Sequence, residues 1–196
     1  MLVETLTSSE ITLSENSNLT LVALLKEGWV GTKKLQFNFK GKNSKLNFIG
    51  IIVAKNKDSF SFETISNHEV PNTKSFYNIR GVSFDQSVVD YKGTLIITKD
   101  AQHTETHLDH HSLIFSKEAK IATLPSLEIE ADNVHAGHAA TIGRINEDHI
   151  FYISSRGIPR ELAKNLLTEN FLKADLSKIS DQKTKQFVID QLMRIK

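Results

Sequence analysis

Two histidines, His135 and His138, lie in a short segment of small residues near the middle of the C-terminal half. The segment reads NVHAGHAATIG and spans residues 133–143. A neutral imidazole nitrogen is a good ligand for iron and other transition metals. Alanine and glycine also let a backbone or a partner approach closely, so the two imidazoles are not crowded. Most histidines are nevertheless structural or solvated, and the spacing alone assigns neither of these two to a metal.

A second group of histidines lies in the run HTETHLDHH, residues 103–111. On a helix, His103 and His107 would share a face and could hold a metal ion together. The run is expected to bridge two strands, where this spacing has no such meaning, so a solvated turn or strand edge is the simpler interpretation. The alternative is a metal-dependent β-helix or cupin-like enzyme that uses the 103–111 histidine cluster. A cupin would need His-x-His followed by Glu and a later His, and this pattern is absent.

The elements that must position these histidines are short strands. Apolar and polar residues alternate in LQFNF at 35–39, in FSFET at 60–64 and in LEIEAD at 127–132. Clusters of Gly, Asn, Asp and Lys separate such runs and predict turns. No window of helical periodicity is found before residue 158, and no strict residue repeat is visible. Periodicity alone therefore predicts an all-β body and leaves a sandwich, a barrel and a β-helix open. The expected strands before residue 116 are 11–13, 19–25, 34–39, 46–54, 59–65, 76–84, 88–91, 94–98 and 112–115.

The pattern changes to helical after Ile158. Pro159 suits the start of a helix, and the following apolar residues form one stripe that includes Leu162, Leu166 and Phe171. A second helix is expected after Ser180, with Val188, Leu192 and Ile195 on one face and with Arg194 and Lys196 at its end. Two domains follow from this change: a β body over residues 1–155 and a C-terminal helical region over residues 156–196. Trp29 is expected in the core or at an end of the β body.

Composition excludes several classes of protein. The chain has 196 residues, a formal net charge of +1 and no cysteine, so it has no disulfide, no thiolate ligand and no cysteine nucleophile. The charge gives no indication of a nucleic-acid surface. The N-terminus lacks the pattern of a signal peptide, and its longest apolar run is too short to span a bilayer, so a cytoplasmic protein without a membrane segment is expected. No phosphate-binding loop, nucleophile elbow or zinc-protease helix is present, which favours a scaffold over an enzyme.

The stretch from Pro125 to Ile158 resembles the SufB/SufD family of iron–sulfur cluster assembly scaffolds. The family pattern runs from P-x-LEI-x-A-D-x-V through a small segment with a Cys and a His to A-T-x-G, a FY pair and S-R-G-I. One position departs from it, because the chain has Ala136 where the family usually has Cys, two residues before the His. The residues that match are Pro125, Leu127, Glu128, Ile129, Ala131, Asp132, Val134, His138, Ala140, Thr141, Gly143, Phe151, Tyr152, Ser155, Arg156, Gly157 and Ile158.

The resemblance implies a right-handed parallel β-helix with a small C-terminal helical region. It implies a SufD-like scaffold subunit of a SufBCD-type complex, since a SufB-like role needs a cysteine to receive sulfur. His138 would then be the ligand for a transient iron–sulfur cluster, with none bound tightly by the isolated chain. The last strands would pair with a SufB-like subunit or with a second copy of the chain. The C-terminal helices, through Leu162, Leu166 and Phe171, would dock a SufC-like ATPase.

Overall fold

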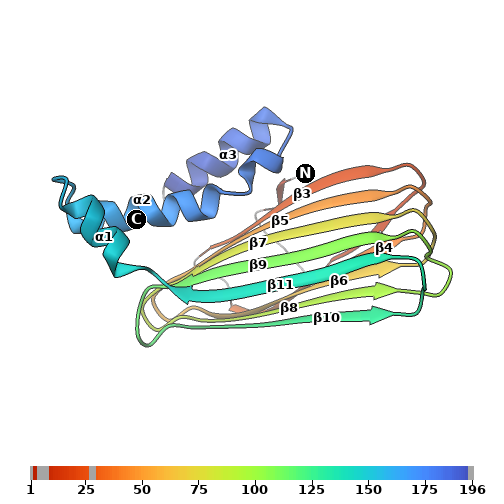
Figure 1. The fold of residues 1–196 in the computed structure, drawn as a ribbon, viewed down its shortest axis with the longest axis horizontal. Helices are drawn as coiled ribbons and strands as arrows, with labels where there is room; N and C mark the ends of the chain where they lie inside the picture. The colour runs from red at the N-terminus through yellow and green to blue at the C-terminus, as the bar shows by residue number, and fades with distance from the viewer. Residues whose placement is uncertain (1, 4–8, 27–29, 194–196) are drawn as a thin grey trace.

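The computed structural model describes residues 2–3, 9–26 and 30–193, and its strands stack into a parallel β-helix with helices at the C-terminal end (Figure 1). Trp29 and the expected helix end at 194–196 lie outside the described residues. The strands are β1 (Leu2–Val3), β2 (Ser9–Leu13), β3 (Asn18–Leu25), β4 (Val30–Phe39), β5 (Lys45–Ala54), β6 (Ser59–His68), β7 (Lys74–Ser83), β8 (Val88–Ile97), β9 (Glu105–Ile114), β10 (Lys120–Ile129) and β11 (His135–Arg144).

Successive strands alternate between two sheets, so that each coil of the chain contributes one strand to each sheet. The odd-numbered strands form a six-stranded sheet in the order β1-β3-β5-β7-β9-β11, and the even-numbered strands form a five-stranded sheet in the order β10-β8-β6-β4-β2. Every pairing between neighbours is parallel. The predicted parallel β-helix is therefore confirmed. Several expected strands were too short, and the runs 88–91 and 94–98 join into the single strand β8.

The corners between the sheets repeat one backbone conformation. Asn16, Asn43, Asn72 and His103 occupy successive turns that lead into the odd-numbered sheet, with φ of 57°, 60°, 62° and 59°. Asparagine tolerates this left-handed conformation better than most residues, and histidine is also enriched there. His103 thus stands where the preceding coils have asparagine, and its position is that of a corner residue.

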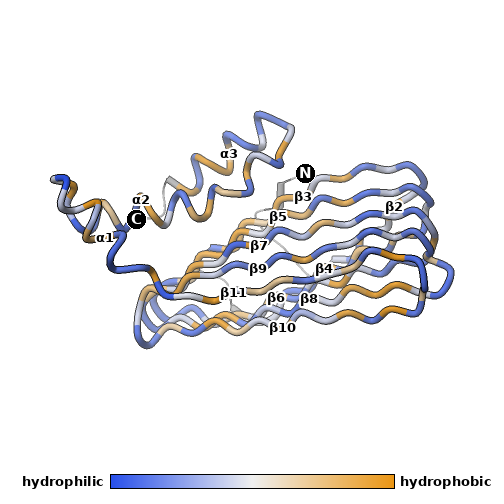
Figure 2. The backbone as a smooth tube through the Cα atoms, in the orientation of Figure 1, coloured by the Kyte–Doolittle hydropathy of each residue, from blue (hydrophilic) through white to orange (hydrophobic). Residues whose placement is uncertain are grey.

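The space between the two sheets holds the main hydrophobic core. Successive side chains of a strand point to opposite faces, and the inward set is buried. Figure 2 shows hydrophobic and hydrophilic residues interspersed along the strands. Phe37, Phe48, Phe62 and Tyr77 form the centre of this core, with ring centroids 5.5–6.2 Å apart between neighbours. Aromatic side chains of this size bury the largest areas and stabilise the stack most.

The C-terminal helices are α1 (Glu147–Ser154), α2 (Arg160–Lys173), the short 3-10 helix η1 (Leu176–Lys178) and α3 (Gln182–Met193). All but α1 contribute residues that pack on the outer face of the odd-numbered sheet. Leu172, Leu176, Ile179, Val188 and Leu192 pack on a second core formed by outward residues of β3, β5 and β7. Burying each such side chain contributes about 1.5–3 kcal/mol before entropy, so the helices are firmly seated on the sheet.

The helical region begins earlier than the sequence predicted. The two expected helices are present as α2 and α3, but α1 lies before residue 158, where no helix was expected. The expectation failed because Ile150, Phe151, Tyr152 and Ile153 are four consecutive apolar residues, which read as a strand. Figure 1 shows α1 projecting beyond the ends of the strands. The division into domains at residues 155 and 156 stays a prediction.

Candidate functional site

The last coil of the β-helix leaves two open strand edges. Within the described residues, β10 pairs only with β8 and β11 only with β9. Pro125 lies in the middle of β10, opposite Gly93 of β8. A proline without an N–H is tolerated in an edge strand and disfavoured in a central one. The outermost coil therefore offers backbone groups and inward side chains that no further coil covers.

Register fixes the direction in which His138 points. His138 pairs with Leu108 of β9, and Leu108 is buried in the core between the sheets. Paired residues of parallel strands project to the same face, so His138 projects toward the interior at the open end of the stack. Its neighbours on that face are Ala136 and Ala140, and the side chain is exposed. His135, three residues earlier, projects to the outer face beside Glu105.

The 103–111 histidines do not converge on one site, and the segment is not a connection between strands. It contains β9, a central strand paired with β7 and β11, which corrects the expected turn or strand edge. His107 projects outward and its Nε2 lies 3.0 Å from Asp109 Oδ1. His111 also projects outward, with Nδ1 2.7 Å from Thr141 Oγ1. No group of three or more His, Cys, Asp or Glu side chains that could hold a metal is found in the described part of the chain.

His110 is the member of this run that projects inward. Its side chain is fully buried, its ring centroid lies 4.9 Å from that of Tyr91, and its Nε2 lies 2.8 Å from Ser112 Oγ. Burial lowers the pKa of His110 to about 4, so the ring is neutral at pH 7. Along β11, Ala140 is its neighbour in the last coil.

The ligand atoms that the chain can offer limit how it could bind an iron–sulfur cluster. The chain has no cysteine, so every thiolate of a cluster would have to come from elsewhere. By register, His138 and, one strand deeper, His110 both project into the space between the two sheets. These two imidazoles could supply some of the ligands of a metal ion or cluster. They could not complete its coordination without ligands from a partner.

Four large apolar side chains of α1 and α2 are exposed. Phe151 is 72% exposed, Tyr152 58%, Leu162 50% and Leu166 38%. Phe171, predicted with Leu162 and Leu166 as a partner-binding residue, is partly buried and packs against the second core beneath the guanidinium of Arg80. The exposure of Phe151 and Tyr152 was not predicted from the sequence. The signal was the N-cap Asn146, whose side chain accepts a 2.8 Å hydrogen bond from the Asp148 backbone.

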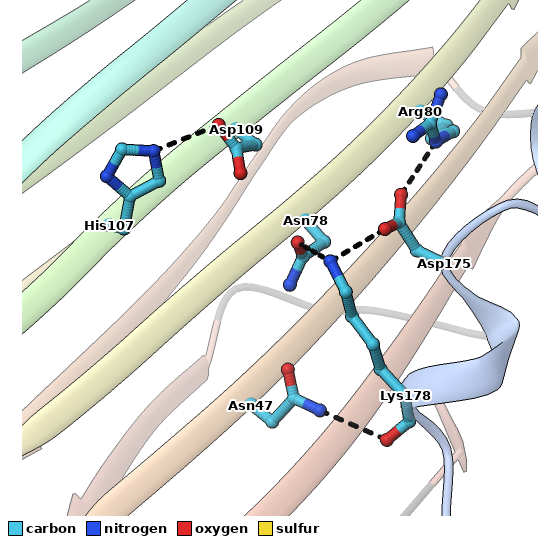
Figure 3. A network of polar contacts seen from close by, with 7 residues as sticks. All are labelled: Asn47, Asn78, Arg80, His107, Asp109, Asp175 and Lys178. Atoms are coloured by element: carbon cyan, nitrogen blue, oxygen red, sulfur yellow. Dashed lines mark hydrogen bonds and ion pairs between the residues drawn. The ribbon is translucent and has the colours of Figure 1, made fainter.

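A polar network fixes η1 on the odd-numbered sheet (Figure 3). Arg80 Nε donates to Asp175 Oδ2 at 2.6 Å, and Lys178 Nζ lies 2.7 Å from Asp175 Oδ1. Lys178 also donates to Asn78. Burial raises the pKa of Asp175, but hydrogen bonds from Lys178 and Arg80 outweigh it and hold that pKa below its usual range. Because these contacts join β7 to η1, they set the position of the helices relative to the strands.

Comparison with known proteins identifies the family. The family model for the SufBD core domain of the SUF system for iron–sulfur cluster assembly matches residues 3–171. The chain is 26% identical over 188 residues to the iron–sulfur cluster assembly protein SufD of Escherichia coli, covering 94% of the chain and 44% of that protein. It is 31% identical over 147 residues to a SufBD family protein of Synechocystis, covering 74% of the chain and 32% of that protein.

A SufBD family protein of Mycobacterium leprae is 26% identical over 185 residues, covering 90% of the chain and 47% of that protein. The chain thus spans less than half the length of these curated relatives. Among the described residues, no helix has the length and apolar character needed to cross a membrane. The match over most of the chain and the parallel β-helix agree with each other, and the chain belongs to the SufBD family of iron–sulfur cluster assembly proteins.

Proposed function

We propose that this chain is a SufD-like scaffold subunit of a SufBCD-type complex in the cytoplasm. The observation that carries the proposal is the open last coil, where His138 projects inward between two alanines on a chain without cysteine. The chain supplies an imidazole at a subunit junction, and a SufB-like partner supplies the sulfur-bearing thiolates. The cluster is cargo that is assembled and passed on, so none is bound tightly by the isolated chain.

Subunit pairing uses the edges of β10 and β11. Open strand edges pair readily with other strands, and alanine and glycine in β11 allow a close approach. Two large apolar side chains of the last coil support this, since Ile129 is 42% exposed and Ile142 40% exposed. Both project inward by register and would be covered by an inward-facing layer of the next coil. The partner is a SufB-like subunit or a second copy of this chain.

Docking of a SufC-like ATPase uses the exposed face of the α1–α2 unit. The predicted residues Leu162 and Leu166 are exposed on α2, and the exposed Phe151 and Tyr152 of the neighbouring α1 would enlarge the docking surface. Phe171 supports this surface from the body side through its contact with Arg80. An exposed apolar surface on a helix pair that is anchored to a rigid body suits a groove on a partner.

Cluster content of a co-expressed complex tests the proposal. The chain is produced with a SufB-like and a SufC-like protein, and iron and sulfide are measured in the purified complex. His138→Ala should sharply lower both contents while leaving subunit pairing intact, because an exposed side chain contributes little to folding. His103→Ala and His107→Ala are the matched controls and should have little effect. Unchanged iron and sulfide with His138→Ala, or equal losses with the controls, would overturn the assignment.

Partner capture tests the two surfaces separately. Leu162→Asp should abolish capture of the SufC-like ATPase and leave pairing with the SufB-like subunit unchanged, because the helix face and the strand edges are separate surfaces. Asn165→Asp adds the same charge at another exposed position of α2 and should leave capture intact. Retained ATPase capture by the Leu162→Asp variant would contradict the proposed docking face.

A further inference from the structure

The imidazole of His110 has an unused nitrogen inside the protein. Its Nε2 lies 2.8 Å from Ser112 Oγ, whereas Nδ1 is buried and has no hydrogen-bond partner among the described residues. An unpartnered buried polar atom costs about 1–3 kcal/mol, so such atoms call for an explanation. In the tautomer with the proton on Nε2, the neutral ring donates to Ser112 Oγ and leaves the lone pair of Nδ1 free to accept a ligand.

His110 and His138 are diagonal neighbours on one face of the odd-numbered sheet. His138 pairs with Leu108, and His110 stands two residues further along β9, opposite Ala140. Strands lie about 4.8 Å apart and rise about 3.3 Å per residue, which puts the two Cα atoms roughly 8 Å apart. Two imidazoles that reach toward each other can share one ion over this separation, since metal–nitrogen bonds are about 2.0–2.1 Å.

The residues around this pair leave room on the side of the open end. Ala140 is the only residue of β11 paired with His110, and its side chain is a methyl group. On the opposite sheet, Thr123 of β10 pairs with Tyr91, against which the His110 ring packs. Thr123 Oγ1 is likewise buried without a hydrogen-bond partner among the described residues. Thr123 and His110 are thus both neighbours of Tyr91, and each carries a buried polar atom without a hydrogen-bond partner among the described residues.

We propose that His110 Nδ1 and His138 together bind one divalent metal ion of the ferrous or zinc type at the open end of the β-helix. The hydrogen bond to Ser112 completes the arrangement, because a metal-bound histidine commonly donates its other ring N–H to a nearby oxygen. Imidazole nitrogens suit iron, zinc, cobalt and nickel in preference to magnesium and calcium. The identity of the ion as iron rests on the proposed function, whereas the two-histidine site does not.

Zinc binding by the isolated full chain tests the site without any partner. Zinc chloride is titrated into the protein labelled with ¹⁵N at histidine, and ring nitrogens are followed by long-range ¹H–¹⁵N spectra. His110 Nδ1 and one nitrogen of His138 should shift together and saturate at one equivalent. His110→Gln and His138→Gln should each weaken zinc binding roughly 10- to 100-fold. His107→Gln, on the outward face of the same strand, should bind zinc as the wild-type chain does.

Two results would overturn the site: zinc that shifts His138 and leaves His110 unchanged, or wild-type affinity in the His110→Gln variant. If the buried substitution prevents folding, the spectra of the wild-type chain still decide. Failure of the two-histidine site can be distinguished from failure of the proposed function. A loss of cluster content with His138→Ala, together with no zinc effect on His110, would refute the two-histidine site alone.

Discussion

Acid should destabilise this protein through a histidine that has no role in the proposed site. His68 is fully buried, and its ring stacks on Phe39 with centroids 4.1 Å apart. Its nitrogens lie 2.7 Å from Thr73 Oγ1 and 3.0 Å from the hydroxyls of Ser66 and Ser75. Burial lowers the pKa of His68 from 6.5 to about 3, because the charged ring would lose its hydration.

The size of the effect follows from proton linkage. Between pH 7 and pH 5 the folded chain keeps His68 neutral, while the unfolded chain takes up a proton near pH 6.5. The unfolded state binds more protons, so the free energy of unfolding rises with pH in this window and is lost as the pH falls. The slope approaches about 1.4 kcal/mol per pH unit, and the total from pH 7 to pH 5 is about 2 kcal/mol. His110, whose pKa is lowered to about 4, adds a similar loss.

Urea unfolding at several pH values between 7 and 5 measures this dependence. The wild-type chain should lose about 4 kcal/mol over the window, and His68→Gln should lose about 2 kcal/mol, whatever its stability at pH 7. The comparison uses the difference in slope, so the cost of replacing a buried side chain does not enter. His149→Gln, which removes an exposed histidine from α1, should keep the wild-type slope. An identical slope for His68→Gln and the wild-type chain would refute the argument from burial.

Three further predictions concern stability and pairing. Asp175→Asn should lower the free energy of unfolding by about 1–3 kcal/mol in urea, because Arg80 and Lys178 would lose their acceptor, whereas Asp190→Asn on α3 should change it by less than about 0.5 kcal/mol. Gly41→Ala should cost about 1–3 kcal/mol or more, because its Cβ would lie 1.9 Å from the backbone nitrogen of Glu15. Ile142→Asp should weaken subunit pairing at least about tenfold in analytical ultracentrifugation without loss of monomer stability, since the side chain is exposed in the single chain. Equal stability of Asp175→Asn and Asp190→Asn, a neutral Gly41→Ala or unchanged pairing of Ile142→Asp would each contradict its prediction.

Alternation of apolar and polar residues located most of the strands, and it did not show how they stack. Alternation in β6 follows from its residues, because Phe60, Phe62, Thr64, Ser66 and His68 are all on the buried face. The coils do not appear in the sequence as a repeat of identical residues, because the number of residues between equivalent corner positions varies along the chain. The corner asparagines were the available signal, because each stands in the same left-handed turn one coil after the previous one. The family resemblance, and not periodicity, therefore decided for a β-helix.

The sequence located the segment that carries the candidate site, and it did not show which side chains of the site are buried. The motif located His138 in a small-residue segment, and the structure adds that its side chain projects toward the interior. His110 was grouped with His103, His107 and His111, and only the boundaries of β9 separate its inward side chain from the outward ones. If a strand had been predicted to begin at residue 105, the alternation of side chains between its two faces would have put His110 on the face opposite His107 and His111. Whether a buried nitrogen has a hydrogen-bond partner depends on tertiary packing, which the sequence does not contain.

Pairing and metal binding at the open end must be linked if both proposals hold. Both use the last coil, where Ile142 is 40% exposed and His138 shares its face. A partner that covers this coil would remove water from His138, and a bound ion with partner thiolates would join the two subunits. By linkage, any factor by which the partner tightens metal binding must equal the factor by which the metal tightens pairing. Sedimentation of the subunits with and without ferrous iron, set against iron titrations of the single chain and the pair, compares these two factors. A large effect on pairing without an equal effect on iron affinity would mean that iron acts at some other place than the subunit junction.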